Sequence, residues 1–202
     1  MDERMRFRST RSPTPAGVAR VALGSIQQIL RRAVPALADF AVVFVVAGRS
    51  IVGVASAHGT PAGERLLRAL RRVYRIRTDD LRSTVAQVVR TGRPALRRGI
   101  VHERPPDAPR GSVADLHYRL ACRSAIVVPL RVSGMVTGAV TLCYAGSGRA
   151  YGPPDFPGAR RVARDIERAA QPPLPHAAPR LRAATGDPRR SAALRRRVVP
   201  RN

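Results

Sequence analysis

The sequence predicts an α+β domain with a single antiparallel sheet. Two pairs of apolar, β-branched segments are each joined by a short turn, Gly48-Arg49 in the first pair and Ser133-Gly134 in the second. Turns this short connect antiparallel strands. Apolar residues at helical spacing precede the first pair and follow the second. Strands joined by tight turns, with helices at both ends, are typical of α+β domains.

Helical spacing of apolar residues predicts a long first helix over residues 17–37. Residues 40–47 are apolar on both faces and mostly β-branched, which is typical of a central strand, and residues 50–57 form the expected second strand of this hairpin. The apolar stripe of the first helix consists of Val18, Val21, Ala22, Ile26, Ile29, Leu30, Ala33, Val34 and Leu37.

Two helices are expected after the first hairpin. One covers residues 62–76 and has a single apolar stripe beneath an Arg-rich outer face. The next covers residues 81–90, and Asp79 or Asp80 is expected to cap it, because a carboxylate there accepts hydrogen bonds from free backbone N–H groups. Its expected inner residues are Leu81, Val85, Val88 and Val89.

The sequence of residues 95–170 predicts a strand, a short helix, a second hairpin and a final helix. We expect a short strand over residues 95–101 and a short helix over residues 113–121. Two strong strands follow over residues 123–132 and 135–144, and the last helix covers residues 155–170.

Every basic residue of the chain is an arginine. The 202 residues include 37 arginines and no lysine, and the formal net charge is +24. This composition excludes a Walker A lysine and a Schiff-base lysine for pyridoxal phosphate. The longest apolar run, residues 40–47, is far shorter than the roughly 20 residues of a membrane-spanning helix. We therefore expect no membrane partner.

The two ends of the chain differ in composition from the core. Residues 1–16 predict a disordered N-terminal arm, and residues 171–202 predict a disordered tail rich in proline and arginine, because neither has enough large apolar residues to offset the entropy of ordering. The arginines of the tail are expected to attract polyanions weakly and in a salt-dependent manner. The folded domain is expected to span residues 17–170.

Cys122 and Cys143 are the only cysteines, and the N-terminus lacks the apolar segment of a secretory signal. Two cysteines form no disulfide framework, so we expect reduced thiols and a cytoplasmic protein. The two thiols are interpreted as small core residues, and a redox role is the alternative. Asp115 and His117 lie two positions apart on an expected helix, where side chains point in different directions, so no metal site is predicted. No motif in the sequence indicates a particular cofactor.

Several short motifs resemble the GAF domain, a family of small-molecule sensory modules, over roughly residues 18–170. The clearest is the run from Arg123 through Pro129-Leu130, followed by a strand that begins at Gly138. Tyr151 and Asp155-Phe156 then lead into the last helix, as in the family pattern. The turn Thr91-Gly92-Arg93-Pro94 also resembles one that these domains often carry.

This resemblance implies a sheet of about six strands, with the first and last helices on one face and shorter helices and loops on the other. It also implies a sensory function, a small-molecule ligand, and a signalling kinase, phosphatase or transcription regulator as a partner in trans. Without lysine, the chain lacks the full residue set of the cyclic-nucleotide-binding members, and neither cysteine matches a bilin attachment site.

Two functions from different classes fit these features. The first is a non-enzymatic sensory or regulatory domain that binds a small molecule or a protein partner. The alternative is a redox enzyme on the same fold, of the methionine sulfoxide reductase type, that uses Cys122 or Cys143. We further expect a homodimer through the first and last helices, because the apolar stripe of residues 18–37 is larger than the sheet alone requires.

Strand alternation places the candidate site. One face of strand 135–144 carries large apolar residues, while the other carries Thr137, Ala139, Thr141 and Cys143, which are small and partly polar. Small residues leave space, so we expect a ligand cavity over Thr141 and Cys143, unless the short helix packs down and closes it. The expected roof is this helix near His117, Tyr118 and Cys122, and the expected partners of an anionic ligand are Arg97 and Arg119.

Overall fold

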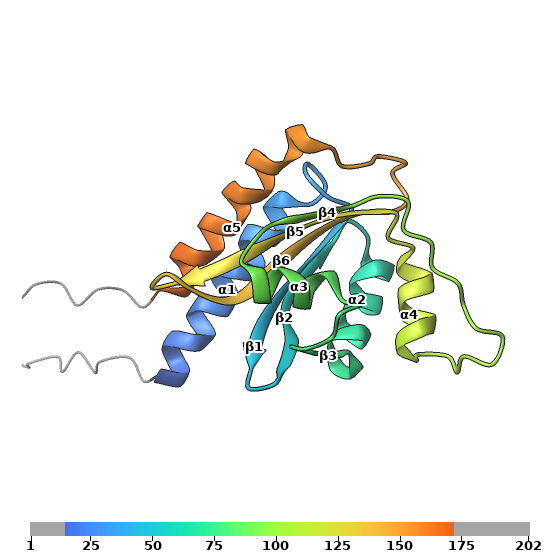
Figure 1. Cartoon of the computed structure of the whole chain (residues 1–202), viewed down its shortest axis with the longest axis horizontal. Coiled ribbons are helices and arrows are strands. Elements are labelled where there is room, and N and C mark those ends of the chain that lie inside the picture. Colours follow the sequence, from blue (N-terminus) through green and yellow to red (C-terminus); the bar gives the residue numbers. More distant parts are fainter. Residues whose placement is uncertain (1–14, 172–202) are drawn as a thin grey trace, which may run out of the picture. The chain divides into compact units, whose positions relative to one another are not determined.

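The computed structural model describes residues 15–171 of the chain, and the side chains from residue 22 onward (Figure 1). Apart from residues 15, 16 and 171, the expected arm and tail lie outside the described residues. Within residues 15–171, no helix has both the length and the apolar character needed to cross a membrane.

The core is one six-stranded antiparallel sheet with the strand order β3-β2-β1-β6-β5-β4. The central pair joins β1 to β6, so it brings together the first and second hairpins, and Val43 lies opposite Val140. The α+β class and the six-stranded sheet are therefore confirmed. The strands are β1 (Phe40–Ala47), β2 (Ser50–His58), β3 (Arg75–Arg77), β4 (Ala95–Arg97), β5 (Ser124–Val132) and β6 (Met135–Tyr144).

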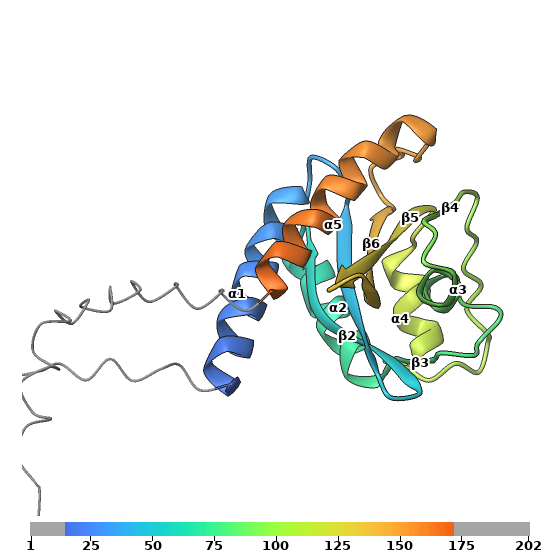
Figure 2. The same ribbon diagram turned by 60° about the vertical axis from the view of Figure 1, so that its left-hand side comes forward.

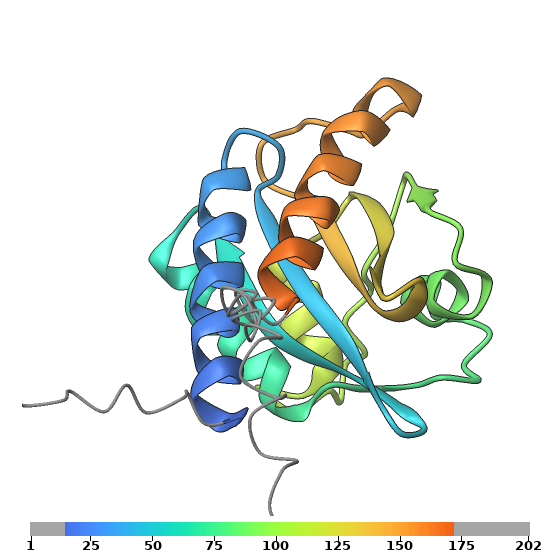
Figure 3. The ribbon, with the colours of Figure 1, turned by 90° about the vertical axis from the view of Figure 1, so that its left-hand side faces the viewer.

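The helices form two layers. On one face of the sheet, α1 (Pro15–Ala33) and α5 (Phe156–Ala170) pack side by side (Figures 2 and 3). On the other face lie α2 (Pro61–Val73), α3 (Thr84–Thr91) and α4 (Val113–Leu120) (Figure 1). A 3₁₀ turn, Pro153–Asp155, leads into α5. The expected division between terminal and shorter helices is confirmed.

The alternation of β6 separates two hydrophobic cores. Val140 and Leu142 belong to the core beneath α1 and α5, whereas Cys143 belongs to the core beneath α2 and α4. Because successive strand residues point to opposite faces, the large residues of β6 meet the long helices and the small ones meet the short helices. This arrangement leaves the cavity on the side of the short helices.

Two expected helices end earlier in the structure. The first ends at Ala33 rather than at residue 37, because Pro35 has no N–H group to continue the helical hydrogen bonds. The second ends at Val73 rather than at residue 76. Residues 75–77 instead form β3, whose Ile76 pairs with Ile51 of β2 and is buried. Pairing with a neighbouring strand thus outweighs the helical pattern of the segment.

The expected start of α3 was wrong. The helix begins at Thr84, and the hydroxyl of Ser83 accepts the capping hydrogen bond from the Ala86 N–H. Asp79 instead pairs with Arg77. Leu81, expected inside the helix, precedes it and is 85% exposed. The strand expected over residues 95–101 is also shorter and ends at Arg97.

Candidate functional site

A cavity of about 250 Å³ lies between the small-residue face of the sheet and the shorter helices. Its walls are mainly apolar, as in most small-molecule sites. The floor comes from β1, β5 and β6, and the sides come from α2, α4 and the start of α3. The apolar and aromatic lining residues are Phe40, Val42, Phe44, Leu67, Leu70, Tyr74, Val85, Ile100, Leu120, Ala125 and Val127.

Four of the six candidate site residues meet in this cavity. Thr141 and Cys143 line its floor, His117 lines it from α4, and Arg97 lines it from β4. Cys122, which follows α4, lines it as well.

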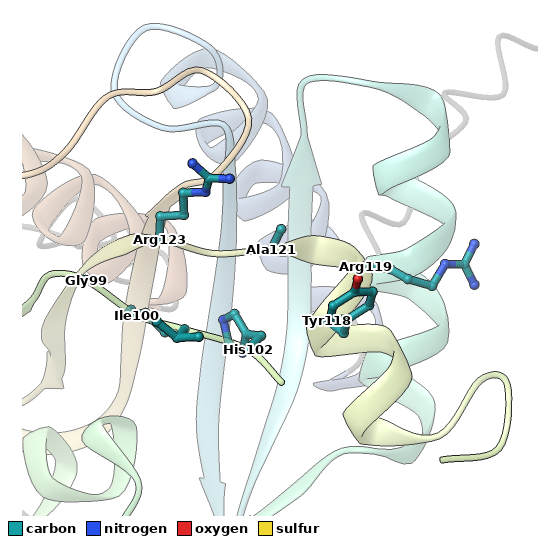
Figure 4. A pocket seen from close by; sticks show the side chains of 8 residues that line it. Gly99, Ile100, His102, Tyr118, Arg119, Ala121 and Arg123 are labelled. Atoms are coloured by element: carbon teal, nitrogen blue, oxygen red, sulfur yellow. The ribbon is translucent and has the colours of Figure 1, made fainter. Parts of the chain in front are cut away.

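Tyr118 and Arg119 lie elsewhere. They line a neighbouring open groove of about 690 Å³, which the loop from Gly99 to His102 borders on its other side (Figure 4). Consecutive residues on a helix point about 100° apart, so α4 can turn His117 inward while Tyr118 stays 49% exposed. The side chain of Arg119 extends away from His102 in Figure 4. Its guanidinium lies 3.6 Å from the carboxylate of Asp115.

A buried carboxylate lies on α4, one of the helices that cover the cavity. Asp115 of α4 accepts hydrogen bonds from the Gly111 N–H at 2.9 Å and from Arg104 at 3.2 Å. The bond from Gly111, together with the charges of Arg119 and Arg104, holds the pKa of this carboxyl below its usual range despite the cost of burial. Ser112 caps the same helix. These contacts tie α4 to the loop that precedes it, and the helix packs against α2.

Two polar atoms in the cavity wall have no hydrogen-bond partner among the described residues. They are Oγ1 of Thr141 and Nε2 of His102, and both are buried. Both residues line the cavity. Buried polar atoms are nearly always paired, and an unpaired one costs about 1–3 kcal/mol.

His102 was missed in the sequence because it lies in a proline-containing loop without periodicity. The loop carries its imidazole to the boundary of the cavity and the groove, and it lines both. Its ring centre lies 5.9 Å from that of His117, whose ring in turn meets Tyr74 edge to face. Burial, followed by the nearby His102, lowers the pKa of His117, so its imidazole is neutral at pH 7.

The rim of the cavity is basic. Arg82 and Arg97 contribute to its lining, and Arg97 Nε donates a 2.9 Å hydrogen bond to Thr84 Oγ1 at the start of α3. Of the described residues that line the cavity, none is acidic. The rim therefore favours a ligand with a negative or electron-rich group.

Both thiols face this space. Cys122 and Cys143 are free and buried. The Cys143 thiol can donate a hydrogen bond to the Cys122 sulfur, and this contact, with the adjacent His102, lowers the pKa of Cys122 although burial opposes the change. Burial raises the pKa of Cys143, and the neighbouring Cys122 raises it further. Within residues 15–171, no cluster of three or more His, Cys, Asp or Glu could hold a metal ion.

Fold and cavity together define a small α+β module with a ligand-sized space between its sheet and its shorter helices. The family model of the GAF domain matches residues 23–169. The chain therefore belongs to the GAF domain family, as its motifs suggested. A comparison with curated proteins finds none that matches.

Solved structures share this fold at low sequence identity. A GAF domain/HD domain protein from Geobacter sulfurreducens is 16% identical, with a TM-score of 0.51 over 77% of this chain and 92% of the other. The GAF-B domain of DevS from Mycobacterium smegmatis is 19% identical, with a TM-score of 0.50 over 78% and 93%. A type II free methionine-R-sulfoxide reductase from Thermoplasma acidophilum is 13% identical, with a TM-score of 0.52 over 76% and 94%.

Proposed function

We propose that this protein is a non-enzymatic sensory or regulatory module whose cavity binds a small molecule. The observation that carries the proposal is the pair of unpartnered buried atoms, Thr141 Oγ1 and His102 Nε2, in the wall of one mainly apolar cavity. The ligand that fits is small and largely apolar. It has one hydrogen-bonding group for these two atoms and an electron-rich group for Arg97 at the rim.

The experiment measures thermal stabilisation by fragment-sized aromatic carboxylates and ketones, including phenylacetate and benzylacetone. Thr141→Leu fills the cavity and removes the hydroxyl, so binding compounds should raise the melting temperature of the wild type but not of this variant. Thr137→Leu is the matched control, because Thr137 belongs to the same strand, β6, but does not line the cavity. Equal stabilisation of all three proteins, or of none, contradicts the proposal.

The second candidate is a redox enzyme of the methionine sulfoxide reductase type. The specific observation in its favour is that Cys122 and Cys143 both line the cavity. In such a reaction two thiols become a disulfide, and the sulfoxide becomes a sulfide and water. Free methionine sulfoxide should then consume both thiols in a titration of free thiols. Two thiols that stay unchanged exclude this function.

For the cellular setting, we propose the cytoplasm, which is consistent with two free thiols. The partner we propose is a signalling kinase, phosphatase or transcription regulator in trans, in keeping with the family. We also propose a homodimer through α1 and α5. Large apolar side chains remain exposed near this pair of helices: Leu23 is 43% and Leu37 is 37% accessible.

A further inference from the structure

We infer that Cys122 is a covalent capture site for α,β-unsaturated carbonyl compounds that enter the cavity. The inference rests on the proposed function, because such a compound must first occupy the same cavity. It goes beyond that function because it names the chemical class of the ligand and the covalent bond that the ligand forms with Cys122. Cys122, Thr141 and His102 supply the nucleophile and the two hydrogen-bonding groups.

The local backbone places the Cys122 sulfur at the cavity wall. Ala121 ends α4 in the left-handed conformation, with φ of 46°, and its N–H donates to the His117 carbonyl at 3.0 Å. This turn directs the chain from α4 into β5 and sets Cys122 within the apolar cluster that also holds Cys143. Cys122 is only 9% exposed and lines the cavity, so reagents reach its sulfur through that space.

The surroundings favour the thiolate at Cys122 rather than at Cys143. The Cys143 thiol and the His102 ring lower the pKa of Cys122, whereas burial keeps Cys143 protonated. A thiolate is the nucleophilic form of cysteine, and the neighbouring thiol and imidazole are groups that stabilise it. Cys122 is therefore the more acidic of the two thiols.

The unpartnered atoms fit the carbonyl group of such a compound. The Thr141 hydroxyl can donate to the carbonyl oxygen, and so can His102 Nε2 when the imidazole carries a proton on each nitrogen, the form that also stabilises a thiolate at Cys122. The Cys122 sulfur attacks the β-carbon and a C–S bond forms, while the electron pair of the C=C bond moves toward the carbonyl oxygen. The resulting enolate is held by the two donors and takes up at its α-carbon the proton that the thiol lost. The sum is addition of S–H across C=C, with no oxidant or reductant.

The remaining lining suits an aryl substituent. Phe40, Phe44 and Tyr74 line the cavity and offer aromatic contacts to the body of the compound. The chain also has no lysine, so no lysine amine competes for the electrophile. No lysine adduct can therefore contribute to the mass shift of this protein.

The experiment compares benzylideneacetone, an unsaturated ketone, with benzylacetone, its saturated counterpart. Intact-protein mass spectrometry follows the adduct, and peptide mapping locates it. We expect one adduct per chain on Cys122 from benzylideneacetone, none from benzylacetone, and none on Cys122→Ser. Thr141→Val keeps the side-chain volume but removes one hydrogen-bond donor. It should slow the reaction about tenfold, which corresponds to the free energy of one hydrogen bond. Thr137→Val, outside the cavity, should react at the wild-type rate.

Four outcomes overturn the inference. Equal rates for Thr141→Val and Thr137→Val would make Cys122 an ordinary thiol without carbonyl activation. An adduct on Cys143 alone would show that Cys122 is not the capture site. If benzylacetone raises the melting temperature but benzylideneacetone gives no adduct, the proposed function stands and the inference falls. If neither compound binds or reacts, both fall.

Discussion

Asp39 joins three parts of the chain that are distant in sequence. Its carboxylate, just before β1, accepts hydrogen bonds from the N–H groups of Ala145 and Ser147 at 2.7 and 3.0 Å, after the end of β6. Arg149 lies 3.4 Å from the same carboxylate and donates to the carbonyl of Pro35 after α1. The carboxylate thus fastens the end of β6 and the loop beyond it to the start of β1.

This network predicts a pH-dependent contribution to stability. Burial alone would raise the pKa of Asp39, but the hydrogen bonds from Ala145, Ser147 and Arg149 outweigh it and lower the pKa. A carboxyl whose pKa is lower in the folded state stabilises the protein above its unfolded pKa of about 4, and the contribution is lost as the pH falls through the folded value. Asp39→Asn should therefore lower the free energy of unfolding by about 1–3 kcal/mol at pH 7 and by much less near pH 2.

Urea denaturation at both pH values checks this prediction. The control is Asp165→Asn, which removes a partly exposed carboxylate paired with Arg168 on the surface of α5. It should change stability little at either pH, since exposed ion pairs contribute little. A loss for Asp39→Asn that is as large near pH 2 as at pH 7 would show that the carboxylate charge is not the cause.

Single residues also show what the sequence could predict about the site. Thr141 and Cys143 follow from strand alternation, which depends only on local backbone geometry, and the structure places both in the cavity. Arg119 was expected there too, but it lies beside Asp115, and sequence spacing does not decide which of several partners an arginine meets. His102 reaches the cavity from an irregular loop, whose path depends on tertiary contacts.

Among the elements, the pairing of β1 with β6 depends on a close backbone approach. A Cβ atom at Gly138 would overlap the carbonyl oxygen of Phe44 on β1. The register between β1 and β2 also shifts at Val43/Phe44, which marks a β-bulge at this point. Glycine at position 138 therefore lets the two central strands meet.

Gly138→Ala should destabilise the sheet by about 1–3 kcal/mol, because the added methyl group has no room and the strands must separate. Gly146→Ala is the matched control: its Cβ would meet no atom within 4 Å. Chemical denaturation of the two variants measures the difference. Similar stabilities for both would mean that β1 can move away from β6 without cost.

Elements with a strong apolar pattern were predictable, and those defined by pairing were not. Residues 123–132 and 135–144 carry long apolar runs around a Ser-Gly turn, and β5 and β6 match these bounds within one residue. By contrast, β3 has three residues and exists because Ile76 pairs with Ile51 of β2. Its sequence continues the pattern of α2, so only the neighbouring strand reveals it.

At the scale of the whole molecule, the face formed by α1 and α5 carries both exposed apolar side chains, which favour association of two copies, and positive charges, which oppose it. Leu23 and Leu37 are partly exposed near this pair of helices, which favours burial against a second copy. The outer surface of α5 carries exposed Arg160, Arg161 and Arg164. Two copies that meet through these helices bring like charges together, and salt weakens such repulsion.

We therefore expect a homodimer whose association strengthens with ionic strength. The Debye length falls from about 10 Å at 0.1 M salt to about 3 Å at 1 M, which screens the arginines while apolar burial persists. Light scattering at tens of micromolar protein should show a dimer, and Leu23→Glu should weaken it by placing a carboxylate in the apolar contact. Leu81→Glu adds the same charge at a residue outside α1 and α5 and should leave the dimer intact. A monomer at every salt concentration, or equal weakening by both substitutions, would show that α1 and α5 do not form the interface.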